Sequence, residues 1–261
     1  MNLFLEALQW ILDPASWSGE NALGMRILEH LGFSAAVVLA AALIGIPAGV
    51  AIGHTGRGRA VVIALTSGAR ALPTLGLLTL LGLALGIGLE APFLALLVLA
   101  LPPVLAGAYA GVEAVPRATV GAARAIGMTE RQVLTGVELP LAAPVIVGGL
   151  RSAALQVIST ATLAAYIADS GLGRPLFRAL KTQEYGIMLG ASILVALLAL
   201  VVELCFQALQ SAAARRAEPH RAKPGRPGRG RARQHRAPDR AGARRAADRH
   251  AHPDAHERID A

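Results

Sequence analysis

RATVGAARAIGMTERQVLTGVELP (residues 117–140) is the longest polar interruption between the strongly apolar segments of this chain. Its first half is rich in good helix formers and is broken at Gly127. Thr129 can then cap a second short helix, with Gln132 three residues later to return the hydrogen bond. We expect Pro140 to end the unit, because a proline pushes the residue before it out of helical geometry. The stretch therefore predicts a helix, a glycine bend and a second helix between two membrane-embedded segments.

The composition is that of a membrane protein. The 261-residue chain is 54% hydrophobic and 16% charged, with a mean hydropathy of +0.51, whereas soluble domains have about 45–50% apolar and about 25% charged residues. Apolar runs of about 20 residues are long enough to cross a bilayer as helices. We predict an all-α polytopic membrane protein with about five transmembrane helices, at residues 33–52, 61–88, 93–112, 141–168 and 186–209.

An N-terminal interfacial segment, residues 1–29, is expected to precede these spans. Residues 3–12 form a helix of mixed character that is too short to cross a bilayer. It is therefore expected to lie at the membrane surface, with Trp10 and Trp17 at headgroup depth. The first residues lack a basic start, so we expect no cleaved signal peptide.

A basic C-terminal tail, residues 213–261, follows the transmembrane domain of residues 30–212. From Arg215 onward the chain carries thirteen Arg and one Lys against six acidic residues, which accounts for the whole net charge of +8. Because the tail has almost no large apolar side chain, we predict that it is disordered. Weak contact with an anionic membrane surface and no selected role are the two interpretations. Nucleic acid is not expected as a partner, since no aromatic stacking residue accompanies the charge.

The distribution of arginine among the loops predicts the orientation. The loops at 54–59 and 117–140 are basic and fall on one side if every span crosses once, whereas the turn at 89–92 and the N-terminal segment are acidic and fall on the other. The loop at 168–185 carries a small basic excess on that second side. We therefore expect an outside N-terminus and a cytoplasmic C-terminus.

Three ionisable residues lie inside the predicted spans: Arg70, Arg151 and Glu203. Such residues are candidates for function. A bond within the helix bundle, or an anchor at the interface, is favoured over a contact with a substrate. Glycines in pairs, Gly45 and Gly49, Gly82 and Gly86, and Gly148 and Gly149, predict close helix contacts, including contacts with a second copy.

Signatures of catalysis do not occur in the sequence. It has no Gly-rich loop that ends in Gly-Lys-Ser or Gly-Lys-Thr and no His-Glu-x-x-His metal site. His30 and His54 have no ligand at helical spacing, and Ser159 has no histidine or acidic residue at that spacing. One cysteine excludes a disulfide within the chain. We therefore expect neither an enzyme nor a cofactor, and an energy source on a separate protein.

The segment 117–140 resembles the coupling loop of bacterial ABC-transporter permeases. That pattern is Glu-Ala-Ala, three residues, Gly, nine residues, then Ile, any residue and Leu-Pro. The spacing is complete here, although Gly121 occupies the place of the usual acidic residue. The resemblance implies a contact with an ATPase through Gly121, Ala122, Ala123, Arg124, Gly127, Arg131, Val137, Leu139 and Pro140.

The small residues of this set would let the first helix sink into a groove of the ATPase. Arg124 and Arg131 would pair with acidic residues there or remain solvated. The implied mechanism is mechanical: ATP closes two ATPase subunits, each holding one coupling helix, and the membrane bundles rock to alternate access.

A second resemblance concerns the solute. The run VELPLAAPVIVGGLRSAALQVISTATLAAYIADSGLG (137–173) and RALPTLGLLTLL (70–81) resemble the osmoprotectant branch of these permeases, which carries glycine betaine, choline and carnitine. In that branch a separate binding protein captures the quaternary amine in an aromatic cage. The resemblance thus implies the inner-membrane permease subunit of a bacterial importer. Its partners would be an ABC ATPase, a substrate-binding protein, a second permease subunit and the lipid bilayer.

Alternative functions remain at this point. An ABC permease for another small solute, such as an amino acid, is the alternative within the class. A stand-alone channel or secondary carrier would not need a docking segment with this spacing. A structural or assembly protein is supported only by the glycine spacing.

Overall fold

The structure, a computed structural model, describes residues 2–19 and 21–217, apart from the side chains of residues 69 and 70. The described residues form helices joined by turns and contain no strand. Four helices are long and apolar enough to cross a membrane, and they confirm the all-α polytopic class. From residue 218 onward, the predicted basic tail lies outside the described residues. Residues 213–217 belong to the last helix.

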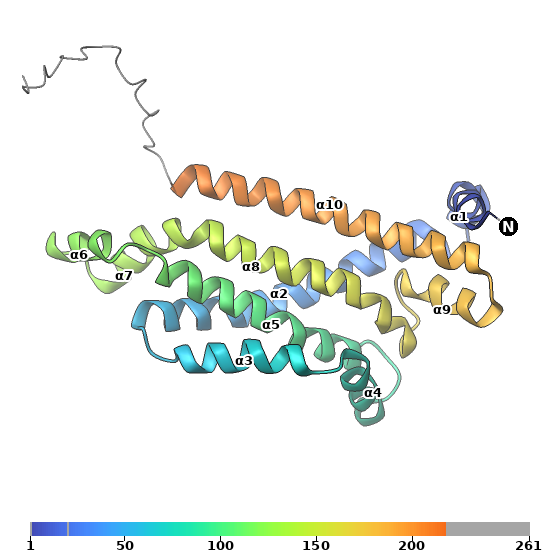
Figure 1. The fold of residues 1–261 in the computed structure, drawn as a ribbon, viewed down its shortest axis with the longest axis horizontal. Helices are drawn as coiled ribbons and strands as arrows, with labels where there is room; N and C mark the ends of the chain where they lie inside the picture. The colour runs from blue at the N-terminus through green and yellow to red at the C-terminus, as the bar shows by residue number, and fades with distance from the viewer. Residues whose placement is uncertain (1, 20, 218–261) are drawn as a thin grey trace, which may run out of the picture. The chain divides into compact units, whose positions relative to one another are not determined.

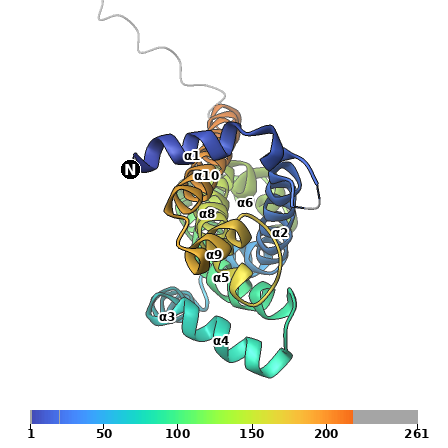
Figure 2. The ribbon, with the colours of Figure 1, turned by 90° about the vertical axis from the view of Figure 1, so that its right-hand side faces the viewer.

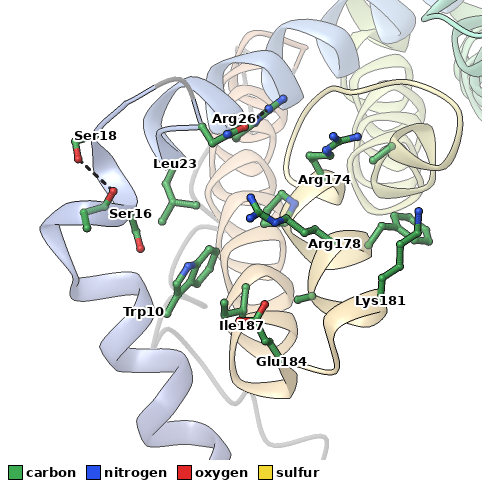
Figure 3. A pocket seen from close by; sticks show the side chains of 16 residues that line it. Trp10, Ser16, Ser18, Leu23, Arg26, Arg174, Arg178, Lys181, Glu184 and Ile187 are labelled. Carbon is green, nitrogen blue, oxygen red and sulfur yellow. Dashed lines mark hydrogen bonds between the residues drawn. The ribbon is translucent and has the colours of Figure 1, made fainter.

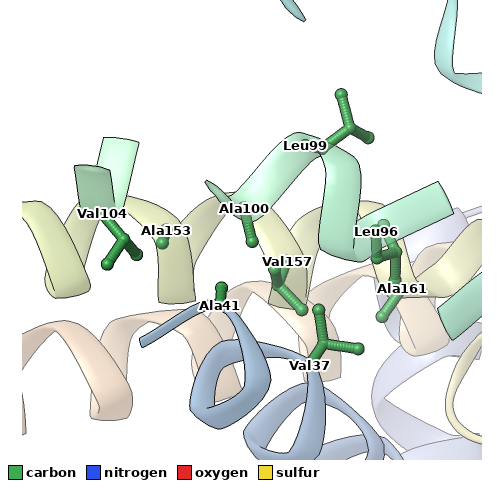
Figure 4. Packing of buried hydrophobic residues seen from close by; sticks show 9 residues of the cluster. All are labelled: Val37, Ala41, Leu96, Leu99, Ala100, Val104, Ala153, Val157 and Ala161. Carbon is green, nitrogen blue, oxygen red and sulfur yellow. The ribbon is translucent and has the colours of Figure 1, made fainter. Parts of the chain in front are cut away.

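The four long helices lie side by side (Figure 1). They are α2 (Leu23–Thr55), α5 (Glu90–Glu113), α8 (Leu139–Thr160) and α10 (Tyr185–Ala217). Helix α5 packs between α2 and α8, and α10 packs along α8. Apolar residues from α2, α5 and α8, with Ala161 directly after α8, meet in the main core, shown in Figure 4: Val37, Ala41, Leu96, Leu99, Ala100, Val104, Ala153, Val157 and Ala161.

Glycines bring these helices into close contact. A Cβ at Gly49 of α2 would lie 2.5 Å from the Leu105 carbonyl oxygen of α5, and a Cβ at Gly107 of α5 would lie 2.6 Å from Gly149 Cα of α8. Only glycine allows backbones to approach so closely. Gly86 was expected to make such a contact, but nothing lies within 4 Å of a Cβ built there. It instead ends a helix, at a φ of +87°.

The predicted span at 61–88 is not one helix. It is divided into α3 (Arg59–Ala71) and α4 (Thr74–Leu85), because Pro73 disfavours helical geometry at Leu72. Helix α3 runs along the bundle and α4 lies across it (Figures 1 and 2). At 13 and 12 residues, each rises about 18–20 Å, less than the hydrocarbon thickness of about 30 Å.

The N-terminal segment contains α1 (Leu3–Leu12) and the 3-10 helix η1 (Pro14–Trp17). Helix α1 lies across α10, as Figure 2 shows, and buries Ala7 against it. Phe4, Leu8 and Leu12 share an exposed face of α1. This arrangement has the geometry that an interfacial helix requires, with the axis across the bundle and an apolar face outward.

Candidate functional site

The segment 117–140 forms a helix, a bend and a second helix at one end of the bundle (Figure 1). Helix α6 (Arg117–Ala125) is followed by Gly127 at a φ of +87°, a left-handed conformation that favours glycine. Helix α7 (Glu130–Val133) begins with the predicted capping box: Thr129 Oγ1 accepts from Gln132 N–H, and the Gln132 side chain accepts from Thr129 N–H. The predicted local structure is confirmed.

The expectation that Pro140 ends the unit is wrong. A π-helical turn, η2 (Leu134–Glu138), joins α7 to α8, and the helix continues from Glu130 to Tyr166. In this turn Leu139 N–H donates to Leu134 O, five residues back. The wider turn leaves room for a proline ring that would clash with the carbonyl four residues earlier in a regular helix.

A small core of its own holds the segment together. Val115, Val120, Ala123 and Val133 are buried in it, and Val137 packs against them. Of the residues implied in a partner contact, Ala123 and Val137 therefore face inward. Leu139 packs against a neighbouring cluster of α2, α5 and α8.

The outer face of α6 consists of small residues beside one apolar side chain. Ala118, Gly121, Ala122 and Ala125 are exposed, and 81% of Ile126 is exposed. Nothing lies within 4 Å of a Cβ built at Gly121. This face is open to a partner surface, and the position of the absent acidic residue lies within it.

Arg124 is paired within the chain. Its Nε and Nη2 donate to the two carboxylate oxygens of Glu130 at 2.9 and 2.8 Å. These hydrogen bonds raise the pKa of the Arg124 guanidinium. Among the described residues Arg131 forms no ion pair, and its side chain is exposed. Of Arg124 and Arg131, Arg131 is therefore the one available to an acidic partner.

His54 connects the end of α2 to this segment. Its Nδ1 lies 2.5 Å from Glu138 Oε2, and its Nε2 lies 3.3 Å from Glu130 Oε2. Glu138 is only 5% exposed, so its carboxylate needs this partner. Sequence reasoning missed the contact because the two residues are 84 positions apart. The available signal was an acidic residue in an apolar turn.

The intramembrane residues form a second polar connection. Arg151 Nε donates to Glu203 Oε2 at 2.7 Å, and Arg151 Nη2 bonds to Glu203 Oε1. Gln210 extends this link, since its Oε1 accepts from Arg151 and its Nε2 donates to the Pro144 carbonyl. Arg151 and Glu203 are thus brought together across α8 and α10. Arg70 lies in α3, and its side chain is outside what the structure describes.

At the other end of the bundle, near α9 (Gly173–Thr182), polar and charged side chains form hydrogen bonds between segments. Buried Arg26 donates to Glu29, to Asn21 and to the Asp169 carbonyl. His30, also buried, bonds through Nε2 to the Ile158 carbonyl. These contacts hold the turn before α9 against the first turns of α2.

A cavity of about 600 Å³ opens beside these contacts (Figure 3). Trp10, Leu23 and Ile187 supply apolar lining. Arg178 reaches towards Leu23 from α9, and Lys181 lines the same cavity. The cavity therefore has an apolar floor and a mainly cationic rim.

Comparisons with known proteins agree with this geometry. Residues 41–219 match the family described as binding-protein-dependent transport system inner membrane component. The carnitine transport permease protein OpuCB of Listeria monocytogenes is 34% identical over 71% of this chain and 85% of its own. The glycine betaine/carnitine/choline permease protein OpuCD of Bacillus subtilis is 33% identical over 80% of this chain and 91% of its own.

Solved structures show a similar fold. The inward-facing MetNI methionine ABC transporter matches with a TM-score of 0.63 and 21% identity, over 73% of this chain and 95% of that chain. An amino acid ABC transporter matches with a TM-score of 0.58 and 20% identity, over 82% of this chain and 98% of that chain.

Proposed function

Because the chain belongs to the family of binding-protein-dependent transport system inner membrane components, we propose that it is the permease subunit of an ATP-driven importer for osmoprotectants such as glycine betaine, choline or carnitine. The observation that carries the proposal is the similarity to permeases named for these solutes, at 33–34% identity over most of both chains. The ATPase, the substrate-binding protein and a second permease subunit would complete the transporter.

The ATPase would dock on the outer face of α6. Gly121 and Ala122 are exposed there, and Gly127 makes the bend beside it. Small side chains permit a close approach of two surfaces, and Ile126 offers an apolar anchor. Arg131 supplies a free cation at the rim. Ala123, Val137 and Leu139 would act from within by holding the segment in shape.

Movement of the docked segment would reach the membrane by two routes. The first is the continuous helix from Glu130 to Tyr166, which contains Pro140. The second is the contact of Glu138 with His54, which joins the segment to α2. Helices and polar contacts of this kind can transmit a rigid-body displacement between packed elements.

The orientation follows from the docking end. The turn at 56–58, the segment 117–140 and the end of α10 lie at one end of the bundle, whereas α1, the start of α5 and α9 lie at the other (Figure 1). We assign the first end to the cytoplasm of a bacterial cell, which places the N-terminus outside. Helix α1 would lie in the outer interface. The cationic rim around α9 would face the substrate-binding protein.

Solute uptake tests the proposal. The permease is expressed with its ATPase and binding protein in cells that lack other osmoprotectant importers, and uptake of labelled glycine betaine, choline, carnitine and methionine is measured. We expect ATP-dependent uptake of at least one quaternary amine and none of methionine. Uptake of methionine alone would assign the chain to an amino-acid importer.

A further inference from the structure

One face of the second half of α8 carries uncharged polar side chains. Ser152, Gln156 and Ser159 are spaced four and three residues apart, which places them on one helix face. All three are exposed: Ser152 and Gln156 lie in the second half of α8, and Ser159 lies in its last turn, where its hydroxyl donates to the Leu155 carbonyl. Hydrocarbon cannot satisfy the hydrogen-bonding groups of the Ser152 and Gln156 side chains, and each unsatisfied group in lipid is costly. This face is therefore not suited to contact with lipid.

A cavity of about 260 Å³ lies against this face. Ser152 and Gln156 line it from α8, Thr66 from α3, and Pro102 and Pro103 from α5. Thr66 Oγ1 donates to Val62 O, which leaves the hydroxyl lone pairs for another group. Within the described chain, the side chains of Ser152 and Gln156 form no hydrogen bond. The cavity thus has polar groups from two helices with capacity for a ligand or water.

The adjacent prolines add carbonyl acceptors at the same depth. In a regular helix Val98 O and Leu99 O accept from the N–H groups of residues 102 and 103. Pro102 and Pro103 have no N–H, so neither carbonyl can form that bond. Leu99 also lines the cavity. The backbone of α5 beside the cavity therefore includes carbonyl oxygens that lack their usual helical donor.

We propose that this face, formed by Ser152, Gln156, Ser159 and the cavity beside Pro102 and Pro103, is a wall of the solute path and a weak site for a quaternary ammonium group. The inference rests on the proposed function and deepens it. The second permease subunit would stand across the path, since the face points away from the buried core of this chain.

The chemistry of the wall suits this cation. A quaternary ammonium has no N–H to donate, so an uncharged site can stabilise it only through the negative ends of dipoles or through aromatic faces. Hydroxyl, amide and carbonyl oxygens supply such dipoles. None of the residues that line the cavity is charged. A solute path requires binding that is favourable enough for entry and weak enough for exit. An uncharged wall meets both conditions, whereas a carboxylate in a low dielectric would hold the cation strongly.

Uptake by variants tests the role of Gln156. The full transporter is reconstituted in proteoliposomes with wild-type permease, Gln156→Leu or Gln207→Leu. Gln207 is exposed on α10, so its substitution makes the same chemical change away from the proposed path. We expect Gln156→Leu to lower quaternary-amine uptake about tenfold, as for one lost polar contact to a charged group. Gln207→Leu should transport as the wild type does, and all three should retain ATP hydrolysis.

Equal uptake by the three proteins would overturn this inference and leave the proposed function intact. Absence of quaternary-amine uptake by the wild type would overturn the proposed function. A second measurement then decides whether the face is a path wall, whichever solute is carried.

Water access provides that measurement. In a Cys205→Ala background, Ser152→Cys and Gln156→Cys are treated with a membrane-impermeant quaternary-ammonium methanethiosulfonate. This reagent attacks the thiolate, which forms only where water reaches the side chain. We expect both variants to react much faster than Gln207→Cys in the assembled transporter. Equal rates at positions 156 and 207, or no reaction at either path position, would overturn the assignment.

Discussion

His54 Nδ1 lies 2.5 Å from Glu138 Oε2, and this contact joins the end of α2 to the turn that leads into α8. The carboxylate is nearly inaccessible to solvent, while the imidazole also faces Glu130. The ends of α2 and α8 and the segment 117–140 therefore meet at one histidine. If the segment 117–140 moved relative to α2, the buried Glu138 carboxylate would become exposed or would lose its partner His54.

His54→Leu should uncouple transport and destabilise the permease. Removal of the imidazole leaves Glu138 buried without its partner, which costs about 1–3 kcal/mol. We expect a lower melting temperature of the purified permease and a loss of binding-protein-stimulated ATP hydrolysis. Arg124→Gln is the control, because the Arg124–Glu130 pair is exposed to solvent and such pairs contribute little to stability. An effect of Arg124→Gln as large as that of His54→Leu would contradict the role assigned to the buried contact.

Gly127→Trp should leave the protein in the membrane but abolish coupling. Gly127 is exposed at a φ of +87°, with nothing within 4 Å of a built Cβ, so bulk there would meet the docked ATPase and not the permease itself. Gly127→Asn separates the two effects, since asparagine tolerates a left-handed backbone. We expect near-normal uptake with Gly127→Asn and none with Gly127→Trp at equal abundance. Normal uptake with Gly127→Trp would exclude docking at this bend.

Features that depend on neighbours in sequence were predictable. The capping box at Thr129 and the bend at Gly127 follow from residues within four positions, and the structure has both. The apolar runs likewise predicted the four long helices. In each case the decisive interactions are local hydrogen bonds or the length of an apolar segment.

Features that depend on both local backbone preferences and tertiary packing could not be predicted from the sequence in the same way. Pro140 was expected to end a helix, but a π turn accommodates it and the helix continues. Pro73 was placed inside one span, yet it separates two helices. A proline rule alone does not distinguish these outcomes, because packing of the flanking segments decides between them. The partner of His54 was hidden for a related reason: helix packing, not spacing, brings Glu138 to it.

Thiol labelling in intact cells should reveal the orientation. The turn between α2 and α3, which contains Arg57, and the start of α5, at Glu90, lie at opposite ends of the bundle (Figure 1). In a Cys205→Ala background we expect Glu90→Cys to react with a membrane-impermeant reagent and Arg57→Cys to react only after the cells are opened. The reverse pattern would place the segment 117–140 outside the cell and refute its proposed contact with a cytoplasmic ATPase.

The pairing of Arg151 with Glu203 should be measurable as a coupling energy. Either single change to leucine leaves one charge inside the span, at a cost of about 2.5–3.5 kcal/mol for a central position. Removing both charges removes the uncompensated group, so Arg151→Leu with Glu203→Leu should be more stable than either single variant. Thermal unfolding of the four purified permeases gives the double-mutant cycle. Arg151→Lys keeps the charge but loses the bidentate contact with Glu203. Its melting temperature should therefore lie between those of the wild type and Arg151→Leu. If the stability changes caused by the two leucine substitutions were additive, the side chains of Arg151 and Glu203 would contribute to stability independently. This result would contradict their pairing.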